Sequence, residues 1–206
     1  MKRKSVAIAT GLALLTTIVA IAPTTAQTTK DVTIGNQPKV SWVAPKEATM
    51  RLTPTNKYTP TGERILHLDL LIDDQLIERV QAVSGKPGVQ NFRLGQDSRA
   101  GSREPLPQGI YRVGKVDRNG GLPYAMGDTF IPLTPLFATS RSGIGIHRDS
   151  DRHIPGGSGT IGCLGVLNQA GINVIAEFVM TYRVQVLIVD YGLIPAAIAN
   201  RSGTQN

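Results

Sequence analysis

Alternating apolar and polar positions in the first half of the chain predict a β-hairpin. Apolar side chains occupy every second position of one segment: Leu66, Leu68, Leu70 and Ile72. Because successive side chains of a strand point to opposite faces, these four would share one face of a sheet. Asp73 and Asp74 follow as a turn, and residues 76–83 supply the returning strand. His67 and Asp69 fall on the other face, which we expect to be partly solvated.

Four further strands and one helix are predicted downstream. The strands are expected at residues 109–116, 129–133, 144–147 and 184–189, with a turn at residues 119–121. Residues at helical spacing predict one helix that begins near Asn168: Leu167, Gly171, Val174, Ile175, Phe178 and Tyr182. The pattern indicates a mainly β domain, a sandwich-like, curled mixed sheet with one main helix.

The amino-terminal residues are typical of an export signal. Lys2, Arg3 and Lys4 precede a long uncharged stretch, and small residues lead up to Ala26, after which we expect cleavage. The protein would then lie in the periplasm or cell wall, without stable membrane insertion. An uncleaved anchor is the alternative, because the apolar stretch approaches the length of a membrane span.

The remaining chain divides into a linker, one domain and a tail. We assign residues 27–47 to the linker, with Trp42 as a packing residue, residues 48–192 to the domain and residues 193–206 to a polar tail. Loss of three basic signal residues would take the formal net charge from +7 to +4. No dense block of basic residues remains, so we expect an ordinary basic surface and no nucleic-acid partner. We also expect a monomer.

Cys163 is the only cysteine of the chain, so in an exported protein it cannot form an internal disulfide. His147 lies sixteen residues earlier and is the candidate base that would activate the thiol. The glycines between them allow the chain to fold back, and Gly162 and Gly165 leave room for a substrate. Backbone N–H groups beside such glycines can stabilise an oxyanion. The alternative is an inert cysteine buried under the helix.

These residues resemble the L,D-transpeptidase (YkuD-type) catalytic domain. The similarity lies in Ile146-His147, in Pro155-Gly156-Gly157, and in the run from Ser158 through Thr160 and Gly162-Cys163 to Leu164. Two upstream segments, Val83-Ser84-Gly85 and Pro105-Leu-Pro107-Gln-Gly109-Ile-Tyr111-Arg-Val113, are similar to the family's "vstG" and "TPxGxYxV" segments. The resemblance covers residues 49–190.

The resemblance implies that Cys163 forms a thioester with a peptidoglycan stem peptide and that His147 is the base. It also implies that Thr160 orients the loop, that backbone N–H groups around Gly162 form the oxyanion hole, and that no cofactor or metal takes part. Two further residues are expected to contact substrate: Arg148 and Ser158. Arginines of the long segment after the hairpin could attract stem-peptide carboxylates: Arg93, Arg99 and Arg103.

Two positions depart from the family pattern. Ile161 stands where many members have a second histidine, and Gly165 where many have arginine or asparagine. These departures point to one alternative, an inactive wall-binding module that keeps the fold. Transfer of the acyl group to water would give another, an L,D-carboxypeptidase that uses the same residues. A divalent-metal site formed with His147 by Asp149, Asp151 and His153 is a third alternative.

Overall fold

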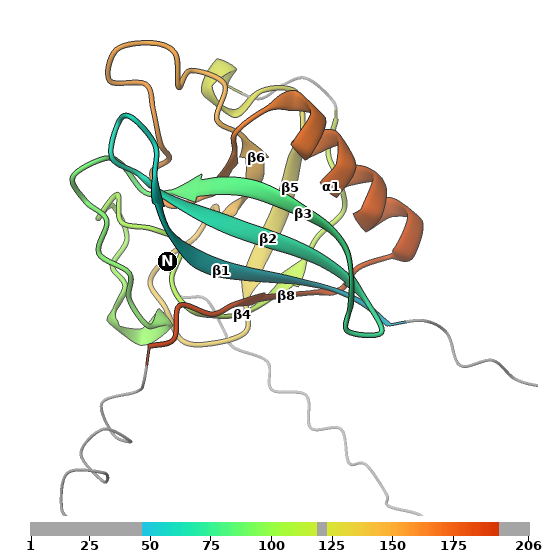
Figure 1. Cartoon of the computed structure of the whole chain (residues 1–206). Helices are drawn as coiled ribbons and strands as arrows, with labels where there is room; N and C mark the ends of the chain where they lie inside the picture. The colour runs from blue at the N-terminus through green and yellow to red at the C-terminus, as the bar shows by residue number, and fades with distance from the viewer. Residues whose placement is uncertain (1–46, 119–122, 194–206) are drawn as a thin grey trace, which may run out of the picture. The chain divides into compact units, whose positions relative to one another are not determined.

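The computed structural model of the protein describes residues 47–118 and 123–193, in which eight strands form one closed, mixed barrel (Figure 1). The strands are β1 (Ala48–Tyr58), β2 (Arg64–Ile72), β3 (Gln75–Ser84), β4 (Gly109–Val113), β5 (Phe130–Pro135), β6 (Gly145–Arg148), β7 (Leu164–Val166) and β8 (Val186–Val189). Their order around the barrel is β1-β2-β3-β7-β6-β5-β4-β8. Only two of the pairs are parallel, β1 with β8 and β6 with β7.

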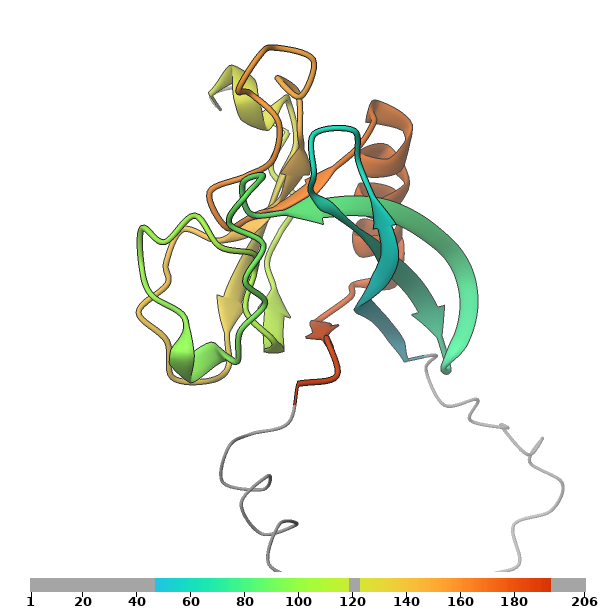
Figure 2. The ribbon, with the colours of Figure 1, turned by 60° about the vertical axis from the view of Figure 1, so that its left-hand side comes forward.

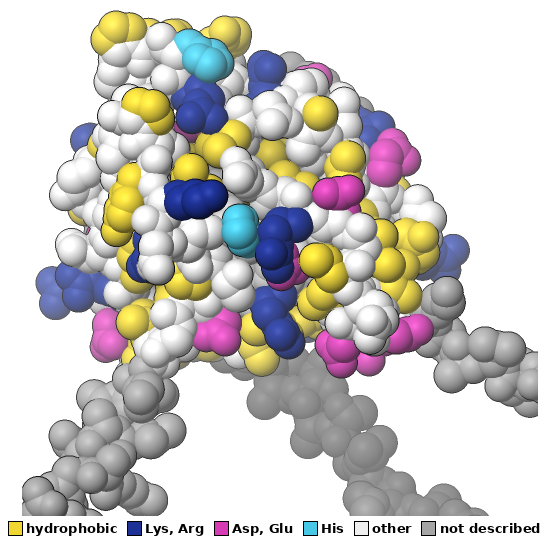
Figure 3. All heavy atoms as spheres, viewed as in Figure 1, with side chains coloured by type: hydrophobic (Ala, Val, Ile, Leu, Met, Phe, Trp, Pro, Cys, Tyr) yellow, Lys and Arg dark blue, Asp and Glu magenta, His cyan; other side chains and the backbone are white. Residues whose placement is uncertain are grey.

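The hairpin of β2 and β3 is confirmed. The four apolar side chains that alternate along β2 are at most 8% exposed, so they form one wall of the core. Asp73 and Asp74 have φ angles of 50° and 60°, the positive values that a tight two-residue hairpin turn requires. On the other face His67 is half-buried, and Asp69 pairs with Arg79 across the strands at 2.6 Å. Figure 3 shows that this side of the molecule carries several basic side chains.

The helix is confirmed as α1 (Gln169–Tyr182), which is the only α-helix among the described residues. The side chain of Asn168 caps its start by accepting a hydrogen bond from the Gly171 amide at 2.8 Å. Its buried face consists of Ile172, Ile175, Ala176, Phe178 and Val179. α1 packs against β3, β6 and β7, beside the curved sheet (Figure 2). The mainly β fold with one main helix is therefore confirmed. The predicted curled sheet closes into a barrel.

Two strands were not predicted, and each has at least one partner that is distant in sequence. β1 contains only two alternating apolar residues that are fully buried, Met50 and Leu52, and Pro54 interrupts its pattern. It forms because β2 and β8 lie on either side of it. β7 has only three residues, too few to show a period, and is held between β3 and β6.

The remaining strand predictions agree with the structure to within a few residues. β4 ends at Val113 rather than at residue 116, because its last partner in β5 is Leu133. The predicted signal segment, Trp42 and nearly all of the linker, the turn at residues 119–121 and nearly all of the tail lie outside the described residues. Within the described part of the chain, no helix has the length and apolar character needed to cross a membrane.

Candidate active site

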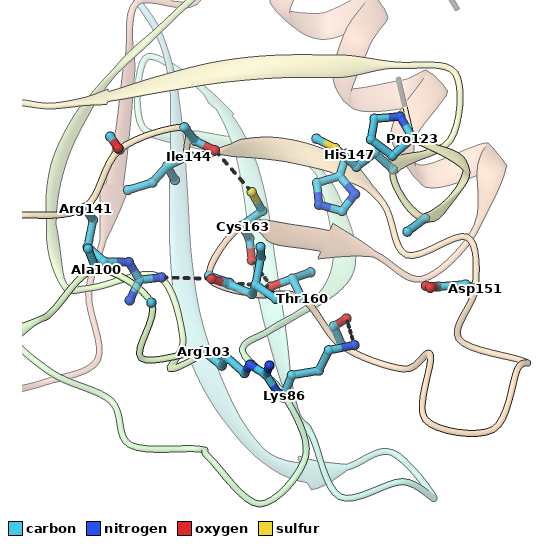
Figure 4. Close-up of a pocket in the computed structure, with 18 residues that line it drawn as sticks. Lys86, Ala100, Arg103, Pro123, Arg141, Ile144, His147, Asp151, Thr160 and Cys163 are labelled. Carbon is cyan, nitrogen blue, oxygen red and sulfur yellow. Dashed lines mark hydrogen bonds between the residues drawn. The ribbon is translucent and has the colours of Figure 1, made fainter. Parts of the chain in front are cut away.

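Two neighbouring strands bring His147 and Cys163 to the same side of the sheet. Ile146 in β6 pairs with Leu164 in β7, and both side chains are fully buried in the core. His147 follows Ile146 and Cys163 precedes Leu164, so each projects to the opposite face. There both side chains line one cavity of about 730 Å³ (Figure 4). The structure thus places the predicted nucleophile and base at the same cavity.

The position of the nucleophile is set by two hydroxyl groups. Thr160 Oγ1 donates to the Cys163 carbonyl oxygen at 2.6 Å, and Ser84 Oγ donates to the same oxygen at 2.7 Å. Ser84 is fully buried and also accepts from the Leu106 amide at 2.7 Å. Thr160 Oγ1 further accepts from the amides of Gly85 and Gly162, each at 3.2 Å. These contacts fix the loop immediately before β7.

The amide of Gly162, predicted to be an oxyanion donor, therefore donates within the loop to Thr160. The position itself requires glycine, because its φ is +122° and a Cβ there would lie 1.5 Å from Arg141 Nη2. Gly165 also leaves no space for the family's longer residue. A Cβ on Gly165 would lie 2.8 Å from Thr160 Cγ2 and 3.2 Å from Asp149 Cβ.

A buried carboxylate anchors the glycine-rich loop at its start. Glu63 is fully buried and accepts hydrogen bonds from the hydroxyls of Ser158, Thr59 and Thr61, the last at 2.6 Å. Burial opposes ionisation of Glu63, but these hydroxyls outweigh it and hold the pKa of Glu63 below its ordinary value. Lys86 Nζ adds three hydrogen bonds to successive carbonyls of the same loop, those of residues 157, 158 and 159, at 2.9–3.0 Å.

We expect Glu63→Ala to lower the free energy of unfolding at pH 7 by about 3 kcal/mol, because the buried hydroxyls of Ser158 and Thr59 and the hydroxyl of the exposed Thr61 lose their acceptor. Glu63→Gln is the matched control, since it keeps the shape and one acceptor oxygen and should cost less. A carboxyl with a lowered folded-state pKa stabilises above its unfolded pKa, and this contribution disappears as pH falls through the folded pKa. The difference between wild type and Glu63→Gln, measured by denaturant unfolding, should therefore shrink below about pH 4. An unchanged difference down to pH 2.5 would contradict this role.

The orientation of His147 is determined by a main-chain carbonyl. His147 Nδ1 lies 2.8 Å from the carbonyl oxygen of Arg148, and a carbonyl can only accept, so Nδ1 carries the proton. Nε2 is then the basic nitrogen of the neutral ring. The imidazole also stacks on Phe130 of β5, with ring centroids 6.4 Å apart. The sequence alone did not indicate which carbonyl would fix the tautomer.

Burial favours the neutral forms of both the Cys163 thiol and the His147 imidazole. Burial lowers the pKa of His147, and the Arg148 carbonyl and the charge of Asp151 only partly oppose this. Burial raises the pKa of Cys163, against the opposing effects of the Gly145 amide and the charge of Arg141. A preformed thiolate–imidazolium pair is therefore disfavoured, and the proton must move when a substrate is attacked.

Positive charge dominates the cavity. Its lining includes Lys86, Arg103 and Arg141, against the single acidic residue Asp151. Of the three arginines predicted to attract carboxylates, only Arg103 lines this cavity. Arg93 pairs with Glu104 at 2.8 Å, and Arg99 lies with it at a separate, smaller cavity.

Other predicted residues have roles outside the cavity. Ser158, predicted to contact substrate, is buried and donates its hydroxyl to Glu63. The Arg148 side chain donates to Ser150 Oγ at 2.9 Å, so its main-chain carbonyl is the part that serves the site. The alternative metal site is not assembled, because no group of three or more His, Cys, Asp or Glu among the described residues could hold an ion. Asp149 instead accepts from the Gly159 amide at 3.1 Å, and His153 is exposed.

Four residues of the site were not predicted to act there: Glu63, Ser84, Lys86 and Arg141. Ser84 lies in the segment Val83-Ser84-Gly85 that resembles the L,D-transpeptidase domain. The turn residues that follow it could have indicated a role for Lys86. Nothing in the sequence links Glu63 or Arg141 to the site, because Glu63 reaches the loop through Ser158, 95 residues away, and Arg141 binds Ser98, 43 residues away.

The chain matches no model of a known protein family. A comparison with curated proteins likewise finds no significant sequence match.

Proposed function

We propose that this protein is an exported cysteine acyltransferase that carries out L,D-transpeptidation on peptidoglycan stem peptides, with Cys163 as nucleophile and His147 as base. The observation that carries the proposal is that thiol and imidazole line one cavity, with His147 Nδ1 bound to a carbonyl and Nε2 left as the basic nitrogen. The resemblance of the loop around Cys163 to the L,D-transpeptidase catalytic domain supplies the reaction class. As part of the same proposal, we infer that the barrel is a variant of the sandwich-like sheet of that family.

The reaction begins when His147 Nε2 takes the proton of the Cys163 thiol as the sulfur attacks the carbonyl carbon that precedes the terminal D-residue. The S–C bond forms and the carbonyl electron pair moves to oxygen. When this oxyanion collapses, the C–N bond breaks, and His147 returns the proton to the departing amine. The products are a thioester on Cys163 and a free D-amino acid.

In the second half of the reaction an amine of another stem attacks the thioester. His147 accepts the proton of this amine as the new amide bond forms, and the Cys163 sulfur leaves and regains a proton from the ring. Water as the acceptor would give the carboxypeptidase reaction with the same residues. No step requires a cofactor.

The charge of the cavity supports a substrate that carries carboxylates. Arg103 lines the cavity, has an exposed side chain, and takes part in none of the three ion pairs among the described residues. Its backbone is held in the left-handed region at φ 58°, an uncommon conformation for a residue with a side chain, while its carbonyl accepts from the Lys86 amide at 3.0 Å. We assign Arg103 to the carboxylate of the departing D-residue.

Arg103→Glu is expected to raise KM for a stem ending in a free carboxylate about five- to tenfold, with kcat little changed, because a charge at the cavity edge contributes to binding. A stem with an amidated terminus should show little change. Arg99→Glu is the matched control, since it makes the same charge change at the separate cavity. Steady-state release of the D-amino acid, or of its amide from the amidated stem, measures the effect, and equal losses on both stems would refute the assignment.

Incubation of the mature protein with a tetrapeptide stem tests the proposal directly. Intact-mass spectrometry should show an adduct with the mass of the stem less its terminal D-residue, together with free D-amino acid in solution. A second stem added as acceptor should remove the adduct and yield a cross-linked dimer. If no adduct and no D-amino acid appear across stems with different diamino acids, the proposed function is wrong.

A further inference from the structure

The guanidinium of Arg141 is buried beneath the loop that carries the nucleophile. Arg141 is 7% exposed, and Nη1 donates to the hydroxyls of Ser98 and Ser102, each at 3.1 Å. Nη2 donates to the carbonyl oxygens of Glu104 at 3.3 Å and Ile161 at 3.4 Å. All four acceptors are neutral, so they satisfy the donors without cancelling the charge.

No carboxylate compensates this charge within the described residues. The three ion pairs there are Arg79 with Asp69, Arg93 with Glu104, and Arg118 with Glu177, and none includes Arg141. Glu104 offers Arg141 only its main-chain oxygen, because its carboxylate binds Arg93. A buried cation without an anion is costly in the free protein. Such a cost is recovered when a negative charge forms nearby.

The reacting centre is one place where such a charge can form, because it shares a cavity with Arg141. Arg141 lines the same cavity as Cys163, and its Nη2 occupies the space that a side chain on Gly162 would fill (Figure 4). The bond of Nη2 to the Ile161 carbonyl places the cation against the residues that directly precede the nucleophile. The other charged or titratable groups that line the cavity are Lys86, Arg103, His147 and Asp151. Lys86 is directed instead to three carbonyls of the loop.

We propose that Arg141 is a positioning residue whose uncompensated charge stabilises the negative charge that develops on the Cys163 sulfur and on the substrate carbonyl oxygen. The inference rests on the proposed function for the second of these charges. It supplies a source of electrostatic stabilisation where the Gly162 amide is already bonded to Thr160. The effect of Arg141 on the thiol pKa, which opposes that of burial, has the same direction.

A purely structural role would give a different result from an electrostatic one. Arg141 joins residues 98–104 to the loop before β7, so removing its side chain would disturb both segments whatever its charge does. A useful variant therefore leaves the guanidinium in place and cancels its charge. Ser98 is suited to this, because its hydroxyl accepts from Nη1 and the side chain is 4% exposed.

The test compares Ser98→Asp with Ser98→Asn, which have nearly the same size and both offer an oxygen to Nη1. The rate of alkylation by iodoacetamide as a function of pH gives the pKa of Cys163, even if the protein acylates no stem peptide. Ser98→Asp should raise this pKa by about one unit and slow adduct formation with a tetrapeptide stem about tenfold. Ser98→Asn should shift the pKa by less than about 0.3 units.

Arg141→Lys and Arg141→Gln provide a second pair, of which only lysine keeps the charge. The glutamine variant should raise the thiol pKa, and the lysine variant should stay close to wild type. If aspartate and asparagine at position 98 give the same pKa, or lysine and glutamine at position 141 shift it equally, the proposal is overturned and Arg141 is structural. A wild-type protein that forms no adduct but shows these pKa shifts would refute the proposed function alone.

Discussion

Cys163→Ala is expected to abolish both the covalent adduct with a tetrapeptide stem and the release of the D-amino acid. The chain contains no other cysteine, and the reaction as proposed has no second nucleophile. The fold should survive, because the thiol forms only a weak hydrogen bond, from Sγ to the Gly143 carbonyl at 3.7 Å. Loss of one small buried group typically costs about 1 kcal/mol. The result is measured by intact-mass spectrometry at several incubation times.

Cys163→Ser separates the chemistry of sulfur from the presence of a side chain at this position. Serine preserves a hydroxyl where the thiol was, but it is a weaker nucleophile, so it too should show no adduct on the timescale of wild type. Thermal unfolding of both variants should lie close to that of wild type. Release of a D-amino acid by the well-folded alanine variant would place the nucleophile elsewhere and refute the mechanism.

His147→Asn is expected to slow acylation about 10²- to 10⁴-fold, the usual contribution of a general base. Asparagine can keep a donor near the position of Nδ1 and so retain the bond to the Arg148 carbonyl. It lacks a counterpart of Nε2, so the variant removes the base with little change at the anchor. Single-turnover adduct formation, followed by mass spectrometry, measures this step apart from acceptor binding.

The pH dependence of wild type identifies the same group. Protonated imidazole cannot accept the thiol proton, so the acylation rate falls as pH drops through the folded pKa of His147. Because burial lowers that pKa, the acidic limb should lie below the ordinary histidine value of about 6.5. In His147→Asn this limb should vanish. If it persisted unchanged, another group would be responsible for the acidic limb and the assignment of His147 would fail.

Local pattern was sufficient for much of the fold. The alternation in β2 and the helical spacing after Asn168 each involve residues that bury one face of a single element, so the signal lies within a short segment. β1 and β7 escaped prediction because Pro54 interrupts the pattern of β1 and β7 has only three residues, and each also pairs with a strand far along the chain, such as β8 beside β1. Closure of the barrel depends on these long-range pairs, so no short segment of the sequence indicates it.

The same division applies to the site. Cys163 and His147 could be predicted because a single cysteine in a chain with a signal-like start, and a histidine among glycines, are unusual in themselves. The residues that hold the loop around Cys163 in place could not be predicted. Ser84 and Glu63 contact the loop from 79 and 95 residues away, and a buried serine or glutamate looks like any other in a sequence. Ser158 looked like a substrate contact for the same reason, since its acceptor is distant.

The nucleophile and base stand on or directly beside paired strands, whereas much of the cavity wall comes from two connecting segments, residues 100–103 and 123–126. The reaction of an electrophilic inhibitor with the thiol would therefore depend on the strands that position Cys163 and His147. Its selectivity would depend on its contacts with the two connecting segments. Under the proposed function, substitutions in the two segments would change the choice of donor while the reacting pair stays in register. Compounds that engage only the sulfur would act broadly, and those that also reach Arg103 or Met126 would discriminate among related proteins.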